Sequence, residues 1–509
     1  VWDEQDGQTT SGWSFFEMGL LRPQDWTAHW IGADFYGGPR TTSPAPHLRR
    51  EFELRPGLVR ARIYVTALGL YELSVNGQPA GEQVFAPGWT DYGKRVQVQT
   101  LDVTDLLQEG PNALGVILGD GWYCGHVAWR DRQVYGERPK LLMQVHLDFE
   151  DGSREVLVSD GAWKFASGPI LESDMLMGEA YDARRELPGW DRPGYDELGW
   201  RQVQVFEPPS IRLDPMLGPP VRRILEIRPP EDPKPVGGWP TSRWLVDLGQ
   251  NMVGRVRLRV KGAAGTTVRL RFAEMLKDGA LYTKALRGAR VTDYYTLKGD
   301  PGGEEYEPHF TFHGFRYVEV SGVSEKLDRE SITGIVLHSD TPVTGEFECS
   351  DELVNQLQRN IQWGQRGNFL EVPTDCPQRD ERLGWTGDAQ VFVRTACFNM
   401  DVAGFFHKWQ RDIDDSQSSE GSVPPVVPNP GLGPDGGPAW ADAAIICPWT
   451  IYECYGDPAI LQRHYESFKA FVGYLETEVS KDYIRSYPGM EGFLGYGDWL
   501  STKADTPID

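Results

Sequence analysis

Acidic, basic and aromatic side chains are concentrated in one short segment, residues 375–388, which reads Asp-Cys-Pro-Gln-Arg-Asp-Glu-Arg-Leu-Gly-Trp-Thr-Gly-Asp. Cleavage of a glycosidic bond needs a carboxyl group that protonates the leaving oxygen, polar groups that hold hydroxyls, and a flat apolar face for the ring. The segment contains all three kinds of side chain. A solvated run of charges beside a structural tryptophan would have the same composition, so composition alone favours neither interpretation.

Two of the acidic residues, Asp380 and Glu381, are adjacent in the chain. A carboxylate raises the pKa of a neighbouring carboxyl group because a second negative charge close by is unfavourable. The pair is therefore expected to keep one acid protonated near neutral pH, which is the state that a proton donor needs.

The bulk composition excludes several classes of function. The 509 residues carry a formal net charge of −23, so neither a nucleic acid nor an anionic lipid surface is an expected partner. We find no stretch of the roughly 20 apolar residues that a membrane span requires. The six cysteines are scattered without a Cys-x-x-Cys pair, which favours free thiols in a reducing, cytoplasmic compartment over disulfides or a zinc site. The chain begins with Val1, so secretion stays open.

The first 345 or so residues show the period-two alternation of strands, with Asn-Gly and Asp-Gly turns between them. Many short strands with regular turns predict β-sandwiches or jelly rolls. We predict an N-terminal segment (1–45), a β-sandwich (46–210) and a second β-sandwich (211–345). A proline-rich stretch, 207–233, is interpreted as a linker or an irregular crossover between the two.

Near Ser350 the pattern changes to helical spacing, with Ser350 as the expected N-cap of the first helix and Thr386 as that of the second. Strands followed by helices predict separate domains, here an all-α domain over 346–509. A ring of about a dozen average helices needs about twice this length, so we expect only the first part of a toroid. The later helices are expected at 388–398, 402–413, 439–455 and 459–479.

The segment 375–388 resembles the signature of the bacterial-type α-L-rhamnosidases, glycoside hydrolases whose catalytic domain is an (α/α)6 barrel. The resemblance extends along nearly the whole chain. It includes residues 26–32, 71–77, 87–92 and 119–123 in the first half, 247–254 and 313–317 in the second predicted sandwich, and 438–442 and 497–499 in the helical part.

The resemblance implies a role for individual residues. Glu381 matches the general acid, with Asp380 beside it in the sugar site. The other matched positions hold hydroxyls or form the walls of the rhamnose pocket: Asp375, Arg379, Trp385, Asp388, Trp440 and Trp499. The implied reaction is the inverting release of terminal α-L-rhamnose, without a cofactor. The family's general base, a Glu, and a later His have no counterpart here, so this stretch alone is expected to be inactive.

Several alternatives remain open at this point. A carbohydrate-binding or scaffold protein with an incomplete barrel, or another (α/α)6 exo-glycosidase or lyase, would share many of these features. The loop around Asp91 and Tyr135-Gly136 could hold a sugar, with calcium as in some relatives, although plain connections are favoured. His309 and His313 are expected to make core hydrogen bonds rather than bind a metal. The expected partner is a rhamnose-containing glycoside, and homo-oligomerisation is left open.

Overall fold

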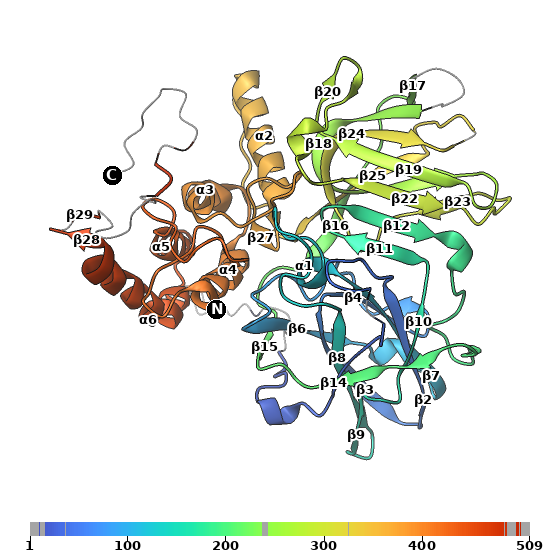
Figure 1. The fold of residues 1–509 in the computed structure, drawn as a ribbon. Helices are drawn as coiled ribbons and strands as arrows, with labels where there is room; N and C mark the ends of the chain where they lie inside the picture. Colours follow the sequence, from blue (N-terminus) through green and yellow to red (C-terminus); the bar gives the residue numbers. More distant parts are fainter. Residues whose placement is uncertain are drawn as a thin grey trace.

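The computed structural model describes residues 10, 16–35, 37–236, 243–323, 325–482, 484–485, 495–497 and 499. Strands dominate the chain as far as Ser339, with one short α-helix, α1 (Gly121–Cys124), among them, and the longer α-helices begin at Glu352. Figure 1 shows the strands in blue to yellow and the helices in orange and red, on opposite sides of the molecule. This confirms the predicted order of a strand-rich part followed by a helical part. Of the first 15 residues of the predicted N-terminal segment, the structure describes only residue 10. Residues 500–509 also lie outside the described residues.

Two sheets face each other in the first part of the chain and share one core. The seven-stranded sheet has the order β14-β1-β8-β3-β6-β15, with β9 beside β8, and the six-stranded sheet the order β13-β10-β2-β7-β4-β5. Buried residues of both sheets, such as Val65 and Val116, form a single hydrophobic cluster, which is the arrangement of a sandwich. The strands are β1 (Trp30–Gly32), β2 (Pro46–Leu54), β3 (Leu58–Leu68), β4 (Leu70–Val75), β5 (Gln78–Pro79), β6 (Arg95–Asp102), β7 (Gly110–Gly119), β8 (Lys140–Phe149), β9 (Arg154–Val158), β10 (Lys164–Ser167), β13 (Arg201–Gln202), β14 (Gln204–Phe206) and β15 (Arg212–Pro215).

The second part is built on one ten-stranded sheet with the order β11-β12-β22-β19-β24-β18-β25-β16. Its long strand β18 pairs with β24 and β25, while β17 and β23 pair with β18 outside this path. The strands are β11 (Ile170–Asp174), β12 (Gly178–Asp182), β16 (Val221–Ile227), β17 (Lys234–Val236), β18 (Arg243–Val260), β19 (Thr267–Ala273), β22 (Thr292–Thr296), β23 (Glu304–Tyr306), β24 (His313–Ser321) and β25 (Ile332–Ser339); two short hairpin strands are β20 (Leu276–Lys277) and β21 (Ala280–Leu281).

The predicted boundary between residues 210 and 211 does not divide the strands by sheet. β11 and β12 precede this boundary but belong to the ten-stranded sheet, where Ala180 of β12 lies opposite Tyr294 of β22 in a parallel pair. β15 follows the boundary but pairs with β6 of the first sandwich. Such pairings between distant segments leave no trace in a local period-two pattern. The proline-rich stretch holds β15 and β16, one for each sheet, while the domain division itself stays a prediction.

Five helices follow the strands, and the N-caps of the first two differ from those expected. α2 begins at Glu352 with Asp351 as its N-cap, because the Asp351 carboxylate accepts the Leu353 N–H at 2.9 Å; Ser350 does not cap it. Thr386 is the first residue of α3 rather than its cap, and its hydroxyl donates to the Pro425 carbonyl. The helices are α2 (Glu352–Asn368), α3 (Thr386–Asn399), α4 (Ala403–Ser416), α5 (Ala443–Tyr455) and α6 (Ala459–Tyr474), the last continued by one π turn over Leu475–Val479. In the described part of the chain no helix combines the length and the apolar character that crossing a bilayer would need.

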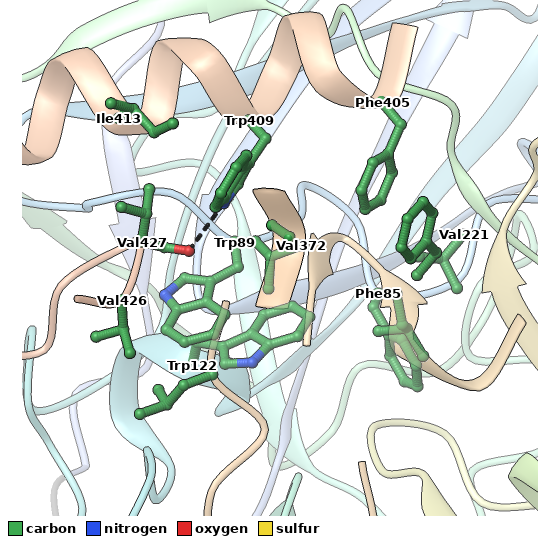
Figure 2. Close-up of a cluster of buried hydrophobic side chains, with 14 of the residues drawn as sticks. Phe85, Trp89, Trp122, Val221, Val372, Phe405, Trp409, Ile413, Val426 and Val427 are labelled. Atoms are coloured by element: carbon green, nitrogen blue, oxygen red, sulfur yellow. Dashed lines mark hydrogen bonds between the residues drawn. The ribbon is translucent and has the colours of Figure 1, made fainter. Parts of the chain in front are cut away.

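The first sandwich and the helices share a hydrophobic core. Figure 2 shows Trp89 and Trp122 of the sandwich beside Val372 and Trp409 of the helical part. The two sandwich indoles are stacked, with centroids 5.6 Å apart and an interplanar angle of 6°. Trp409 donates its indole N–H to the Val427 carbonyl at 3.2 Å. The helical part is therefore packed against the sandwich and is not a separate body on a linker.

A buried network of charges lies beside this core. Arg95 at the start of β6 contacts Asp412 and Asp415 of α4, each at 2.5 Å. Lys408, one turn earlier in α4, lies 2.8 Å from Asp412 and donates to the Trp89 carbonyl at 2.6 Å. All four of these charged side chains are at most 4% exposed. Each buried charge has an opposite partner, which is the condition for tolerating it away from water.

Glu371 borders the same network and precedes the segment that carries the candidate site. It is 4% exposed, and burial raises its pKa from an ordinary 4.5 to about 7, an effect that the nearby Lys408 charge reduces. The turn between β26 (Phe369–Leu370) and β27 (Val372–Pro373) places Glu371 in the left-handed region, with φ of 66°. Its carboxyl group is therefore held in place by backbone geometry as well as by packing.

We expect the folded protein to lose stability as the pH rises from about 4.5 to about 7, because of Glu371. In that window the folded state still holds a proton that the unfolded chain has released, so unfolding becomes more favourable as protons are removed. The pKa difference corresponds to on the order of 3 kcal/mol. Glu371→Gln does not titrate, so urea unfolding of both proteins between pH 4.5 and pH 8 should show the variant gaining on the wild type as the pH rises. Parallel pH curves for the two proteins would contradict this.

Candidate functional site

The segment 375–388 is folded as a loop between β27 and the start of α3, held by backbone hydrogen bonds. The Asp375 N–H and the Trp385 N–H both donate to the Leu383 carbonyl, at 3.1 and 3.0 Å. The Thr386 N–H donates to the Pro425 carbonyl at 2.9 Å, which ties the end of the loop to a distant segment. The loop is thus closed on itself around Leu383, and side chains from both of its arms are brought together.

Arg382 anchors this loop to the ten-stranded sheet. It is 3% exposed, and its guanidinium donates to the Phe312 carbonyl at 2.7 Å and to the Met175 carbonyl, and lies over the Phe312 ring. Burial lowers the pKa of Arg382 to about 9. Met175 lies between β11 and β12, and Phe312 lies directly before β24. The sheet therefore fixes the position of the residue that follows Glu381.

Glu381 is buried, and its carboxylate oxygens accept hydrogen bonds from two sides. One oxygen accepts the Trp385 indole N–H at 2.7 Å. The other lies 2.9 Å from a guanidinium nitrogen of Arg287 and 2.7 Å from one of Arg379. These three donors fix the orientation of the carboxyl group without any bound ligand.

Arg287 changes the expected relation between the two adjacent acids. Its guanidinium also donates to Asp380 at 2.7 Å, and the Gly288 N–H donates to the other Asp380 oxygen at 2.9 Å. The sequence suggested mutual repulsion between Asp380 and Glu381, but a cation bridges them in the structure and offsets that repulsion. Arg287 follows the short turn Lys284–Leu286 in the strand-rich part. Nothing in the local sequence pattern indicated that it would reach the loop.

Asp375 and Asp388 lie on the other side of Glu381. The Cys376 thiol donates to Asp375 at 2.9 Å, and the pKa of that thiol is raised by burial and by the adjacent carboxylate. The Asp388 side chain is exposed, yet desolvation of its carboxyl group, with the charges of Asp375 and Glu381, raises its pKa to about 6. Ligand atoms of Asp375, Cys376 and Glu381 lie within 4.8 Å of one another, but Arg379 already contacts both carboxylates.

The three tryptophans singled out from the sequence meet at one tyrosine. Trp385, Trp440 and Trp499 each contact the ring of Tyr496, with centroids 5.6, 4.9 and 5.7 Å away. Trp440 also packs on the first turn of α3, where a Cβ atom at Gly387 would lie 2.6 Å from the indole, so only glycine fits there. Tyr496 was not predicted from the sequence, although it directly precedes the matched residues 497–499.

A cavity of about 670 Å³ opens beside these residues. Its lining includes four of the residues predicted from the sequence, namely Asp375, Asp388, Trp440 and Trp499. Trp385 and Glu381 are not part of that lining. Trp385 contacts Tyr496, whose ring also contacts Trp440 and Trp499, and a Glu381 carboxylate oxygen lies within 4.8 Å of one of Asp375. Flat aromatic faces and carboxylates at one cavity are what binding a sugar ring requires. The structure therefore brings the predicted residues together, while their roles stay predictions.

The other sequence-based candidates make ordinary structural contacts. His309 lies 2.8 Å from Glu72 and His313 lies 3.1 Å from Asp293, as expected for core hydrogen bonds. Asp91 accepts the Gly93 N–H at 2.9 Å. Among the residues that the structure describes, Asp91 belongs to no group of three His, Cys, Asp or Glu side chains whose ligand atoms lie within 4.8 Å of one another. A calcium ion there would need carbonyl oxygens as further ligands, and this expectation stays a prediction.

Three domain families of known proteins match successive parts of the chain. Residues 57–225 match the α-L-rhamnosidase N-terminal domain. Residues 239–338 match the bacterial α-L-rhamnosidase concanavalin-like domain, and residues 342–509 match the bacterial α-L-rhamnosidase six-hairpin glycosidase domain. Together these matches include strands of all three large sheets and the helices α2–α6.

Individual relatives agree with this assignment. An α-L-rhamnosidase of Streptomyces avermitilis is 46% identical over 521 residues, covering 100% of this chain and 49% of the relative. The crystal structure of Streptomyces avermitilis α-L-rhamnosidase complexed with L-rhamnose matches with a TM-score of 0.87 and 47% identity, covering 92% of this chain and 45% of that one. Native α-L-rhamnosidase of Aspergillus terreus matches with a TM-score of 0.89 and 41% identity, covering 96% and 56%.

The chain spans about half the length of the curated relatives that it matches. Within that span the sequence identity, the three domain matches and the fold agree with one another. The segment 375–388, on which the resemblance was first based, lies inside the six-hairpin domain match. The chain belongs to the bacterial α-L-rhamnosidase family.

Proposed function

We propose that the protein hydrolyses rhamnosides, releasing terminal α-L-rhamnose with inversion, and that Glu381 is the general acid. The observation that carries this proposal is the placement of Glu381. Its carboxyl group is oriented by Trp385 on one side and by Arg287 and Arg379 on the other, next to the cavity lined by aromatic and acidic residues. The L-rhamnose complex of the Streptomyces avermitilis relative supports the same class of sugar as the ligand.

Each part of the site has a task in this reaction. The acid protonates the glycosidic oxygen while a water molecule attacks the anomeric carbon from the opposite face, which requires carboxyl groups roughly 6.5–9.5 Å apart. Asp375 and Arg379, which lie next to each other, would hold ring hydroxyls, with Asp388 beside them. Trp440 and Trp499 would cover the apolar face of the sugar. We assign the general base to no residue of this chain.

The packing of the helices supports the barrel part of the proposal. α5 packs against α3, α4 and α6, so it contacts both of its neighbours in the sequence, as in helical hairpins. α4 also packs against the first sandwich through Trp409 and Lys408. We propose that α2–α6 belong to an (α/α)6 barrel, with the cavity at the end of the barrel where α3 begins.

The proposed reaction has a direct test. The protein that carries this chain should release rhamnose from an aryl α-L-rhamnoside, and ¹H NMR in the first minutes should show the β anomer before mutarotation. Inversion predicts this product because water attacks opposite to the leaving group. Release of the α anomer first would contradict inversion, and preference for another sugar in a panel of aryl glycosides would contradict the substrate. Rhamnose binding without release would favour the carbohydrate-binding alternative.

A further inference from the structure

An exposed tryptophan of the first sandwich lies close to the acid at Glu381. Trp129 is 48% exposed and is located in the loop between α1 (Gly121–Cys124) and β8. The guanidinium of Arg287 lies over its ring, 5.7 Å from the centroid, and the same guanidinium contacts Glu381 at 2.9 Å. One cation thus separates this exposed ring from the proposed proton donor. Figure 1 shows α1, from which the loop starts, at the junction of the strand-rich and helical parts.

The loop that carries Trp129 is anchored on both sides of the tryptophan. The His126 backbone N–H donates to the buried Asp174 at 3.0 Å, and its ring lies 2.8 Å from the same carboxylate. Arg130 donates to the carbonyl of Gly431 in the helical part, and its N–H donates to the Val127 carbonyl at 3.1 Å. A ligand that covers the exposed face of this ring removes apolar surface from water. Because the loop is already anchored, binding needs little further ordering of the chain.

The two oxygens of Glu381 indicate which part of a substrate would meet this ring. The oxygen bonded to Trp385 faces the cluster of aromatic rings around Tyr496, where the rhamnose ring would lie. The oxygen bonded to Arg287 faces towards Trp129. A general acid donates its proton to the oxygen between the sugar and the leaving group. The glycosidic oxygen therefore lies within hydrogen-bond reach of Glu381, and a bulky leaving group continues from there along the surface around the acid, which includes Trp129 on the Arg287 side.

We propose that Trp129 forms the binding surface for the aglycone, stacking on a flat group such as an aryl ring or the apolar face of a second sugar. This inference rests on the proposed rhamnosidase activity and adds a specificity residue from a domain other than the catalytic one. Stacking on an indole is selective for flat apolar faces. The aglycone would lie against the exposed part of the Trp129 ring, beside the Arg287 guanidinium that separates this ring from the acid, with Arg130 and Gly431 at the edge of the surface.

The test compares Trp129→Ala with wild type on methyl, phenyl and disaccharide α-L-rhamnosides. Methyl offers no flat face, so kcat/KM for it should change less than two-fold in the variant. For at least one flat aglycone kcat/KM should fall roughly ten-fold, mostly through KM, which corresponds to about 1.4 kcal/mol. The substrate that loses most identifies an aryl or a sugar aglycone. Trp449→Ala removes an equally exposed tryptophan, 50% exposed on α5, and should leave all three substrates unaffected.

The outcomes separate this inference from other roles of the residue. An equal loss on all three substrates would show that Trp129 acts by holding Arg287 and would overturn the inference. Wild-type turnover with no change in Trp129→Ala would overturn it as well, while leaving the proposed function intact. A wild-type protein that hydrolyses none of the three rhamnosides would contradict the proposed function and this inference together.

Discussion

Replacing Glu381 by glutamine is expected to lower kcat on an alkyl rhamnoside by about 10²–10⁴, the usual contribution of a positioned general acid. Glutamine keeps the size of the side chain but has no proton to donate to the glycosidic oxygen. Its amide N–H₂ also has to face a donor that now bonds to the carboxylate, either the Trp385 N–H on one side or Arg287 and Arg379 on the other. A dinitrophenyl rhamnoside has a leaving group that needs no protonation, so its kcat should fall much less. Steady-state kinetics on both substrates measures the difference.

The informative quantity is the dependence on the leaving group. Asp380→Asn is the matched control, because Asp380 shares Arg287 with Glu381 but receives no hydrogen bond from Trp385. Any disturbance of Arg287 in this control should affect both substrates by the same factor. If Glu381→Gln also loses activity equally on the two substrates, Glu381 is not the proton donor.

Replacing Arg95 by methionine is expected to cost about 3–5 kcal/mol of unfolding free energy, because it removes the buried cation that Asp412 and Asp415 share and leaves Asp415 with only the exposed Arg212. Asp412 and Asp415 both contact Arg95 and are at most 4% exposed. Lys408 would still neutralise Asp412 but does not contact Asp415 in the structure. The site joins the sandwich to α4, so the loss should appear in the transition in which the two parts separate. Urea unfolding followed by tryptophan fluorescence should detect it, since Trp89 and Trp409 lie in the shared core.

Arg212→Met provides the control for this experiment. Arg212 also contacts Asp415, at 2.6 Å, but its side chain is 62% exposed. Exposed ion pairs contribute about 0–1 kcal/mol, so this variant should unfold almost like the wild type. Equal losses for the two variants would show that burial does not determine the energy of this network.

The part of the site that could be predicted from the sequence is the part that is local. Residues 375–388 are one continuous segment that contains several acids, two arginines and one tryptophan. In the structure they form one loop beside a cavity. Trp440 and Trp499 were found only through the resemblance, since nothing in their own surroundings distinguishes them from core tryptophans. The structure places both at the cavity.

The residues that the sequence did not reveal come from distant segments. Arg287 and Trp129 belong to the strand-rich part, and their contacts with the loop and with each other depend on the packing of the two parts. The same limit applies to the strands. The pairing of β12 with β22 joins residues more than a hundred positions apart, and the alternation of side chains along a strand specifies its faces but not its neighbour.

The bridge that Arg287 makes between Asp380 and Glu381 sets a limit on modular engineering of this chain. A chimera that grafts the helical part onto an unrelated carbohydrate-binding module would keep Asp375 and Trp440 but lose this cation. It would also lose the carbonyl groups of Met175 and Phe312 that hold Arg382. The transplanted acid would then stand beside an uncompensated Asp380 on an untethered loop. A functional graft therefore has to carry the ten-stranded sheet together with the helices.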